Sequence, residues 1–283
     1  MLDVNYINCS SGVRMPKIIY GTAWKKERTA ELVGLALQAG FTGIDTACQP
    51  KHYSEPLVGE AISHWVNNGG ERQSLYVQTK FTPLDGQDPT QIPYDKTVSL
   101  KEQVRQSFEV SIKNLQTPYV DCLVLHSPLS SHDLTMQAWG MMENIYETGG
   151  ARQLGISNCY DTDVFQKLYG DAKVKPVVLQ NRFYKDTGYD VDLRRLCVEY
   201  DMIYQSFWTL TANPHILQNE LLKTLGAKYK KTEAQVFFSY LSSSGIVPLT
   251  GTSSTQHMQE DLNFLDFTLS TEELNNIKLL FME

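Results

Sequence analysis

The sequence has no excess of basic residues. Its 283 residues include 25 Lys and Arg against 32 Asp and Glu, which gives a formal net charge of −7 at pH 7. A protein that binds nucleic acid needs clustered positive charge to neutralise phosphates. We therefore expect no nucleic-acid partner.

Long apolar runs and paired cysteines are also missing. No stretch approaches the roughly 18 apolar residues of a membrane span, and the first residues lack the basic and apolar segments of a secretory signal. Neither a Cys-x-x-Cys pair nor a His/Cys/Asp cluster with metal-ligand spacing occurs. We expect a cytoplasmic protein with no membrane partner and no metal. The cysteines are expected to be reduced and mostly buried; they are Cys9, Cys48, Cys122, Cys159 and Cys197.

What the sequence does contain is a regular alternation of two patterns. Short apolar runs rich in β-branched and aromatic residues, typical of strands buried on both faces, cover residues 16–23, 41–47, 75–80, 119–126, 151–158, 177–183, 202–207 and 245–252. Amphipathic patterns with 3–4 spacing, typical of helices, cover residues 27–40, 54–66, 99–115, 134–149, 162–170, 190–200, 232–241 and 255–265.

Eight strands alternating with eight helices predict parallel pairing, because each crossover uses a helix. A doubly wound sheet would carry a glycine-rich phosphate turn after its first strand, but the turn here reads Gly21-Thr22-Ala23-Trp24. We therefore predict an α/β fold, a (β/α)₈ TIM barrel, with residues 1–283 forming one domain.

Polar residues stand where several predicted strands end. They are Asp45, Lys80, His126, Ser157 with Asn158, and Gln180. Each alone is more often a cap, a surface residue or a structural hydrogen-bonding group, but the carboxyl ends of barrel strands converge at one mouth, where sites are built. A carboxylate can hold an ammonium group, and that ammonium can lower the pKa of a nearby acid. This trio suits carbonyl reduction, with Tyr53 as the missing acid.

The chain resembles the aldo-keto reductases. The resemblance rests on GTAW after the first strand, GFTGIDTA, Tyr53 with EPLVGEAI, VQTK, YVDCLVLHSPL, GISN, PVVLQNRFY and the last GTSS, in family order from about residue 14 to residue 280. Microbial and fungal members with longer loops are the most similar. The resemblance implies reduction of aldehydes or ketones by hydride transfer from a nicotinamide cofactor.

The resemblance also implies roles for individual residues. Tyr53 would be the proton donor, Asp45 and Lys80 its tuning pair, and His126 the group that orients the substrate carbonyl. Residues implied to contact the cofactor are Thr22 and Ala23 beneath the ribose, Asp45, Ser157, Asn158 and Gln180 at the carboxamide, Phe207 stacked on the nicotinamide, Trp208 and Leu210 near the pyrophosphate, and Gly251, Thr252, Ser253, His257 and Asp261 around the adenosine.

Two departures from the family pattern bear on these roles. Tyr53 follows Asp45 by eight residues instead of the common five, so an ungapped alignment puts Pro50 at the tyrosine position and leaves His52 as a rival donor. Gly251 and His257 stand where many members have a Lys and an Arg that hold the 2′-phosphate. We therefore expect NADP(H) to be preferred by a modest margin, with NAD(H) possible.

Other functions remain open at this point. The same fold could serve as a non-catalytic, nucleotide-sensing regulatory subunit, and Lys80 could form a Schiff base in an aldolase if it lay in an apolar pocket without a carboxylate. For an enzyme, the expected partner is a small carbonyl substrate, in a pocket expected to be open because the sequence stops soon after a helix predicted at residues 271–282. We expect a monomer or a weak dimer.

Overall fold

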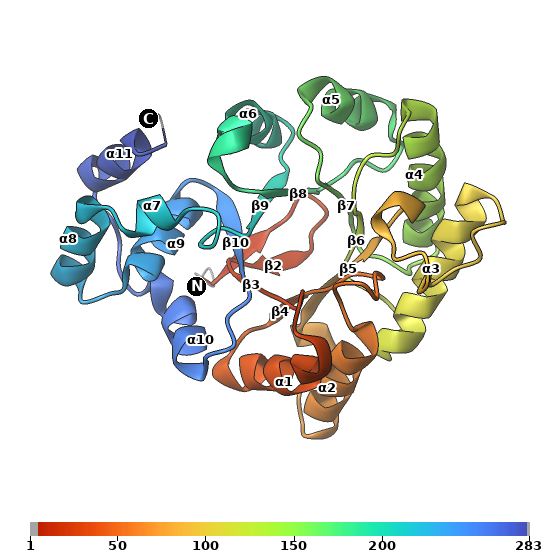
Figure 1. Ribbon diagram of the computed structural model, residues 1–283, viewed down its shortest axis with the longest axis horizontal. Helices are drawn as coiled ribbons and strands as arrows, with labels where there is room; N and C mark the ends of the chain where they lie inside the picture. The colour runs from red at the N-terminus through yellow and green to blue at the C-terminus, as the bar shows by residue number, and fades with distance from the viewer. Residues whose placement is uncertain (1–4, 282–283) are drawn as a thin grey trace.

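Eight parallel strands form a closed barrel at the centre of the protein, and helices surround it (Figure 1). The computed structural model describes residues 5–281. Around the barrel the strand order is β10-β3-β4-β5-β6-β7-β8-β9, so neighbours in sequence are also neighbours in space. The strands are β3 (Ile19–Gly21), β4 (Gly43–Asp45), β5 (Tyr76–Phe81), β6 (Cys122–Leu125), β7 (Leu154–Ser157), β8 (Val178–Arg182), β9 (Ile203–Phe207) and β10 (Ile246–Thr250). The predicted (β/α)₈ barrel is confirmed.

The outer layer consists of helices that return the chain from one strand to the next. They are α1 (Thr29–Ala39), α2 (Glu55–Asn67), α3 (Leu100–Leu115), α4 (His132–Glu147), α5 (Thr162–Asp171), α6 (Val191–Glu199), α7 (Pro214–Leu217), α8 (Glu220–Tyr229), α9 (Glu233–Ser243), α10 (Thr255–Leu262) and α11 (Thr271–Leu279). The eight predicted helices that alternate with the strands are present, and α11 lies in the helix expected near the end of the sequence. The helices α7 and α8, between β9 and α9, were not predicted.

Local signals explain where several of these helices begin and end. α1 stops at Gly40, whose φ of 114° places it in the left-handed region that favours glycine. α9 begins with a capping box in which the Thr232 hydroxyl and the Gln235 side chain each accept from the other residue's backbone N–H. Such caps satisfy the first N–H groups of a helix, which have no partner within it.

A short N-terminal hairpin closes one end of the barrel and was not predicted. It pairs β1 (Tyr6–Asn8) with β2 (Arg14–Pro16) in antiparallel register. Met15 is fully buried and packs in one cluster with Tyr76 and Cys122, the first residues of β5 and β6. The hairpin therefore covers the N-terminal ends of the strands and leaves the carboxyl ends free for a site.

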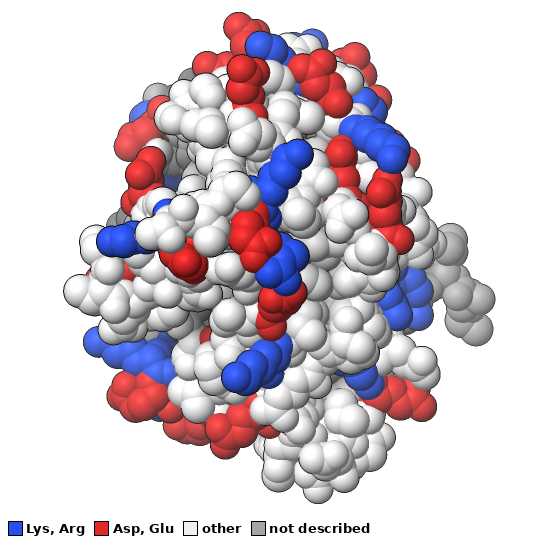
Figure 2. All heavy atoms as spheres, turned by 90° about the vertical axis from the view of Figure 1, so that its right-hand side faces the viewer, with Lys and Arg blue, Asp and Glu red and all other residues white. Residues whose placement is uncertain are grey.

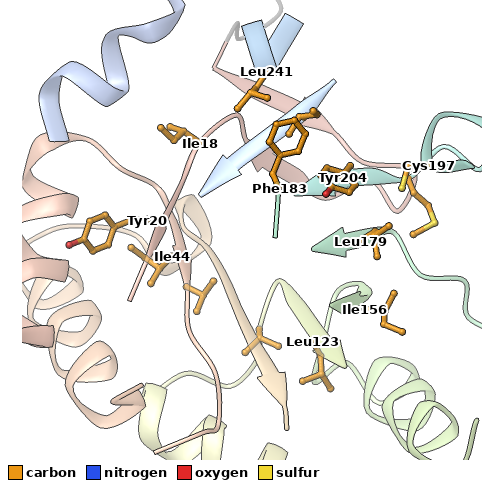
Figure 3. Close-up of a cluster of buried hydrophobic side chains, with 14 of the residues drawn as sticks. Ile18, Tyr20, Ile44, Leu123, Ile156, Leu179, Phe183, Cys197, Tyr204 and Leu241 are labelled. Carbon is orange, nitrogen blue, oxygen red and sulfur yellow. The ribbon is translucent and has the colours of Figure 1, made fainter. Parts of the chain in front are cut away.

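The hydrophobic core lies between the strands and the helices. Figure 3 shows Ile44, Leu123, Ile156 and Leu179, from the barrel strands β4, β6, β7 and β8, among these buried side chains. Trp139 of α4 is fully buried in the same core. Burial of this kind contributes on the order of 25 cal/mol for each Å² of apolar surface, which makes the barrel a firm support for side chains at its mouth.

The surface carries charges of both signs. On the face that includes α3 and α4, Lys and Arg are interspersed with Asp and Glu (Figure 2). The ion pair between Lys173 and Glu147, at 2.6 Å, is an example. Within residues 5–281, no helix is both long enough and apolar enough to cross a membrane. All five cysteines are free and buried, as predicted.

Candidate active site

A groove of ≈ 930 Å³ lies at the carboxyl ends of the barrel strands. Of the residues predicted for the site, its lining includes Ala23, Asp45, Tyr53, His126, Ser157, Asn158, Gln180, Phe207, Trp208, Leu210, Gly251, Thr252, His257 and Asp261. Residues from distant parts of the chain therefore meet at one mouth, as expected for a barrel.

At the base of the groove, Asp45 and Lys80 form a buried ion pair. Asp45 ends β4, Lys80 lies in the neighbouring β5, and the Lys80 Nζ is 2.6 Å from the Asp45 Oδ1. Nζ also donates to the backbone carbonyl of Thr46 at 2.9 Å. Since the Lys80 side chain is 1% exposed, its charge is held in place by these partners rather than by water.

Tyr53 lies immediately above this pair. It precedes the N-cap of α2, and its backbone N–H donates to the carbonyl of Gln49. The Lys80 Nζ is 5.2 Å from the centroid of the phenol ring, and the His126 ring is 6.1 Å away, centroid to centroid. The structure thus brings together the four residues expected to form the catalytic centre.

The electrostatics at Tyr53 differ from the sequence-based expectation that Lys80 lowers its pKa. Burial raises the pKa of Tyr53 above its usual value, and the Asp45 carboxylate raises it further. The reason is that Lys80 is paired with Asp45, so the ion pair presents little net positive charge to the phenol. The hydroxyl therefore stays protonated across the neutral range.

His126 follows β6 and is fixed from two sides. Its Nδ1 is 2.6 Å from the Thr82 Oγ1, and its backbone carbonyl accepts from the Asn158 Nδ2 at 2.9 Å. Burial lowers the pKa of His126 well below its usual value, and the charges of Lys80 and His52 lower it further. The ring is therefore neutral, and its Nε2 remains for a molecule in the groove.

The three extra residues between Asp45 and Tyr53 place His52 against Trp24. The two rings are in contact, with centroids 3.9 Å apart and planes tilted by 37°, and the Trp24 backbone N–H donates to the His52 backbone carbonyl at 2.7 Å. Both residues line the groove and also a second cavity of ≈ 490 Å³, which reaches Tyr53 from the side of α2 and α3.

The opposite wall of the groove is formed by the ends of β7, β8 and β9. The Ser157 hydroxyl donates to the backbone carbonyl of Gln180 at 2.6 Å, and Phe207 is partly exposed at the end of β9. Trp208 is 48% exposed, and the Arg182 guanidinium lies 4.3 Å from its ring centroid. This wall offers flat rings beside polar groups.

The loop after β10 forms the far end of the groove. The Thr252 carbonyl accepts from the Tyr20 hydroxyl at 2.8 Å, and the Asp261 Oδ2 accepts from the Thr250 Oγ1 at 2.6 Å. Burial raises the pKa of Asp261 to about 6, although Thr250 and His257 oppose this effect. The His257 backbone N–H donates to the Ser254 Oγ at 3.3 Å, at the start of α10.

Three predicted residues are not part of the groove lining. Thr22 is fully buried, and its hydroxyl donates to the Asp45 backbone carbonyl at 2.9 Å. Lys80 lies beneath the surface, and Ser253 is exposed on the loop after β10. Their predicted roles remain predictions.

Sequence reasoning missed some residues that line the groove. Lys25 donates from Nζ to the Gly251 carbonyl, which joins the first and last loops of the barrel mouth. Arg182 lies two residues after Gln180, so the alternation of a strand predicts that both point to the same side. Trp24 and Gln49 are further examples.

The comparisons with known proteins agree with this geometry. The sequence model of the family described as "Aldo/keto reductase family" matches residues 17–199. The chain therefore belongs to the aldo/keto reductases, a family of oxidoreductases, and the predicted resemblance is confirmed.

Individual relatives extend the match over nearly the whole chain. An NADPH-dependent alpha-keto amide reductase of Saccharomyces cerevisiae is 26% identical, over 98% of this chain and 91% of the relative. A glyoxal reductase of Bacillus subtilis is 27% identical, over 97% and 92%. The crystal structure of an aldo/keto reductase from Brucella melitensis superposes with a TM-score of 0.82 at 26% identity, and the match covers 97% of this chain and 98% of that one.

Proposed function

We propose that this protein reduces aldehydes and ketones to alcohols, with Tyr53 as the proton donor. The observation that carries the proposal is the position of the Tyr53 ring, 5.2 Å from the Lys80 Nζ and 6.1 Å from the His126 ring, on the wall of the groove. A protonated phenol, a neutral imidazole and a buried ammonium group at one point suit protonation of a carbonyl oxygen.

In this mechanism each residue has one task. Thr82 donates its hydroxyl hydrogen to the His126 Nδ1, so the Nε2 carries the hydrogen that the substrate carbonyl accepts. Tyr53 gives its proton to the oxygen as negative charge develops there. Lys80, 5.2 Å from the ring centroid, is a cation beside the phenolate that remains, and Asp45 offsets much of its charge. Burial keeps water from competing for these contacts.

The groove residues fit a nicotinamide cofactor, which would supply the hydride. Phe207 offers a ring face for stacking, and Ser157, Asn158 and Gln180 offer the amide and hydroxyl groups that recognise a carboxamide. Lys25 and the start of α10 offer positive charge and free N–H groups for phosphates. We propose that Ala23, Trp208 and Leu210 lie along the ribose and pyrophosphate.

We further propose that NADPH is preferred to NADH by a modest margin. The yeast relative is named as NADPH-dependent, but Gly251 and His257 replace the cations that often hold the 2′-phosphate. The remaining donors are the hydroxyls of Thr252, Ser253 and Ser254, the His257 side chain and the N-terminus of α10.

The kcat/KM ratio for the two cofactors tests this preference. We expect a higher value with NADPH, and we expect Ser253→Ala and His257→Ala to reduce the ratio, because a charge-assisted hydrogen bond contributes about 1.5–3 kcal/mol. A preference for NADH in the unchanged protein would contradict the proposal.

Two alternatives have less support. A Schiff-base aldolase needs an unpaired lysine, whereas Lys80 is 2.6 Å from Asp45. A nucleotide-sensing subunit does not need a proton donor, whereas Tyr53 sits beside the buried pair. His52 as the donor also has less support, because its ring lies against Trp24, with centroids 3.9 Å apart.

The substrate class is broad in this proposal. The cavity of ≈ 490 Å³ beside Tyr53 gives a bulky group room next to the reacting carbonyl. We expect aromatic aldehydes and keto esters to be reduced about as well as small aldehydes.

The experiment is NADPH consumption with benzaldehyde, together with measurement of benzyl alcohol. We expect one alcohol for each NADPH consumed. Tight NADPH binding without turnover of any simple carbonyl compound would instead favour the sensing subunit, and borohydride trapping of substrate on Lys80 would favour the aldolase.

A further inference from the structure

Three glutamines meet inside the barrel directly below the groove. Gln78 lies in β5, Gln180 in β8 and Gln205 in β9, and each is at most 2% exposed. Polar amides in a barrel interior are costly unless every donor and acceptor has a partner.

Gln205 is the centre of the cluster. Its Oε1 accepts from the Gln78 Nε2 at 2.8 Å and from the Gln180 Nε2 at 2.9 Å. Its Nε2 donates to the Gln78 Oε1 at 3.0 Å and contacts the Met15 Sδ at 3.4 Å. One amide thus binds both of the others.

The Asp45 carboxylate sets the direction of the two outer amides. Its Oδ1 accepts from the Gln78 Nε2 at 2.6 Å and from the Gln180 Nε2 at 3.0 Å. If either amide turned over, its carbonyl oxygen would face an ionised oxygen without a hydrogen between them. The hydroxyl of Tyr76 completes the arrangement by donating to the Gln78 Oε1 at 2.9 Å.

This network determines which atom Gln180 offers to the groove. Both hydrogens on its Nε2 are used, one toward Asp45 and one toward Gln205. Gln180 also lines the groove. The atom left for a bound molecule is therefore its carbonyl oxygen, which accepts hydrogen bonds and cannot donate them.

We propose that Gln205, oriented by Gln78, is a positioning residue that fixes the Gln180 carbonyl oxygen as an acceptor and so selects dinucleotides whose nicotinamide carries an amino group. The inference rests on the proposed function, because it assumes that a nicotinamide binds at Gln180. Gln205 itself acts only through Gln180, since it lies beneath it in the barrel.

The test compares NADPH with its reduced 3-acetylpyridine analogue, in which a methyl ketone replaces the carboxamide and removes the N–H donors. The dissociation constants of both are measured by quenching of protein fluorescence, since Trp24 and Trp208 line the groove. We expect the unchanged protein to bind NADPH about tenfold more tightly, because the analogue leaves one acceptor without a hydrogen bond.

Gln205→Met removes the acceptor while keeping a side chain of similar length. We expect the preference for NADPH to fall about threefold or more, since Gln180 then lacks one of its two anchors. Gln205→Glu is expected to be protonated, because burial opposes the ionised form. It then keeps an oxygen acceptor for the Gln180 amide and an O–H donor for the Gln78 Oε1, and it is expected to retain the preference. Gln180→Leu, which removes the acceptor itself, defines complete loss of the preference.

Gln153→Met is the matched control. Gln153 is also buried in the barrel, but it donates to the Tyr76 hydroxyl and accepts from Ser11, near the hairpin. A merely structural effect of losing a buried amide would weaken binding of both dinucleotides equally in this variant, and it would leave their ratio unchanged.

The outcomes separate the inference from the proposed function. If Gln180→Leu removes the preference and Gln205→Met does not, the inference is wrong while the cofactor site stands. If the unchanged protein binds neither dinucleotide, the proposed function is wrong, and the inference that rests on it is wrong as well. A preference that falls in Gln205→Met and persists in Gln205→Glu and Gln153→Met supports the inference.

Discussion

The charged residues Asp45 and Lys80 have hydrogen-bond partners within the protein itself. The Asp45 Oδ1 accepts hydrogen bonds from the Lys80 Nζ and from two glutamine amides, so this buried carboxylate is compensated by its surroundings. Tyr53 and His126 are neutral beside it, because burial acts against their ionised forms. The site is therefore ready to respond to a charge that develops on a substrate oxygen.

This arrangement predicts a flat pH profile for carbonyl reduction. A raised pKa keeps Tyr53 protonated as the pH increases, and a lowered pKa keeps His126 neutral as the pH decreases. We expect kcat with saturating cofactor and aldehyde to change less than about threefold between about pH 6 and about pH 9. A steep loss of kcat as the pH rises through the neutral range would instead indicate a histidine donor, with His52 as the candidate.

Asp261 gives a second prediction at the residue scale, on stability. Its pKa is raised from 3.8 to about 6 by burial. This carboxyl group therefore favours the folded protein at a pH below its pKa in the unfolded chain, and that contribution is lost as the pH rises through about 6. Asp261→Asn keeps an oxygen acceptor for Thr250 and removes the ionised form, so it should raise the free energy of unfolding at pH 7 by roughly 2–3 kcal/mol.

Urea unfolding of the parent and of Asp261→Asn at pH 7 and at pH 4 measures this effect. At pH 4 the folded carboxyl is already protonated, so we expect the gain to be small. An equal gain at both pH values would mean that the effect is not electrostatic.

At the scale of elements, α2 carries Tyr53 at its start and must pack closely on α3. Gly59 of α2 allows this approach, since a Cβ atom there would lie 2.0 Å from the Asn114 carbonyl oxygen and 2.8 Å from the Leu115 Cα. These are backbone atoms, which cannot move aside as a flexible side chain can. The position of the proton donor therefore depends on a glycine one turn into the helix.

We predict that Gly59→Ala lowers both stability and activity. The two helices must separate to admit the methyl group, which should cost about 1–3 kcal/mol of unfolding free energy and shift Tyr53 relative to Lys80. The matched control is Gly34→Ala in α1, where a Cβ would meet nothing within 4 Å. That change should stabilise the protein by about 0.5–1 kcal/mol. Thermal unfolding and kcat of both variants provide the check, and similar effects of the two substitutions would contradict the packing argument.

Elements whose residues carry a clear period could be predicted from the sequence, and others could not. The barrel strands are apolar on both faces, so they appear as continuous runs, and the covering helices show 3–4 spacing. The strands β1 (Tyr-Ile-Asn) and β2 (Arg-Met-Pro) contain polar residues and lack the continuous apolar run that marks the equally short β3 and β4. The helix α7 has four residues, which is too short for a helical period to emerge.

The site shows the same division. Asp45, Lys80 and His126 could be identified because they stand at strand ends, where polar residues interrupt apolar runs. Gln78 and Gln205 lie inside strands, where a single polar residue is usually taken as facing solvent. Closure of the barrel buries both side chains, so that Gln78 contacts Asp45 and Gln205 contacts Gln78 and Gln180. The expectation that Lys80 lowers the pKa of Tyr53 was wrong. Burial and the Asp45 carboxylate raise this pKa, and the charge of Lys80 is offset by its pairing with Asp45.

At the scale of the whole molecule, the two ends of the barrel have different roles. The hairpin closes the N-terminal end, the core fixes the strands, and the carboxyl ends hold the groove in which Tyr53, Lys80, Asp45 and His126 meet. That residues 1–283 act as one domain remains a prediction. The central claim is that this mouth reduces carbonyl groups with a proton from Tyr53.

Aldehyde reduction by Tyr53→Phe, measured beside His52→Ala and the unchanged protein, tests that claim most directly. The account predicts that Tyr53→Phe lowers kcat by about 10²–10⁴-fold while the Kd for NADPH stays within about twofold, because the lost hydroxyl donates the proton and the proposed cofactor contacts lie elsewhere. His52→Ala should retain most of the activity. Near-normal turnover in Tyr53→Phe, with loss of turnover in His52→Ala, would contradict the account.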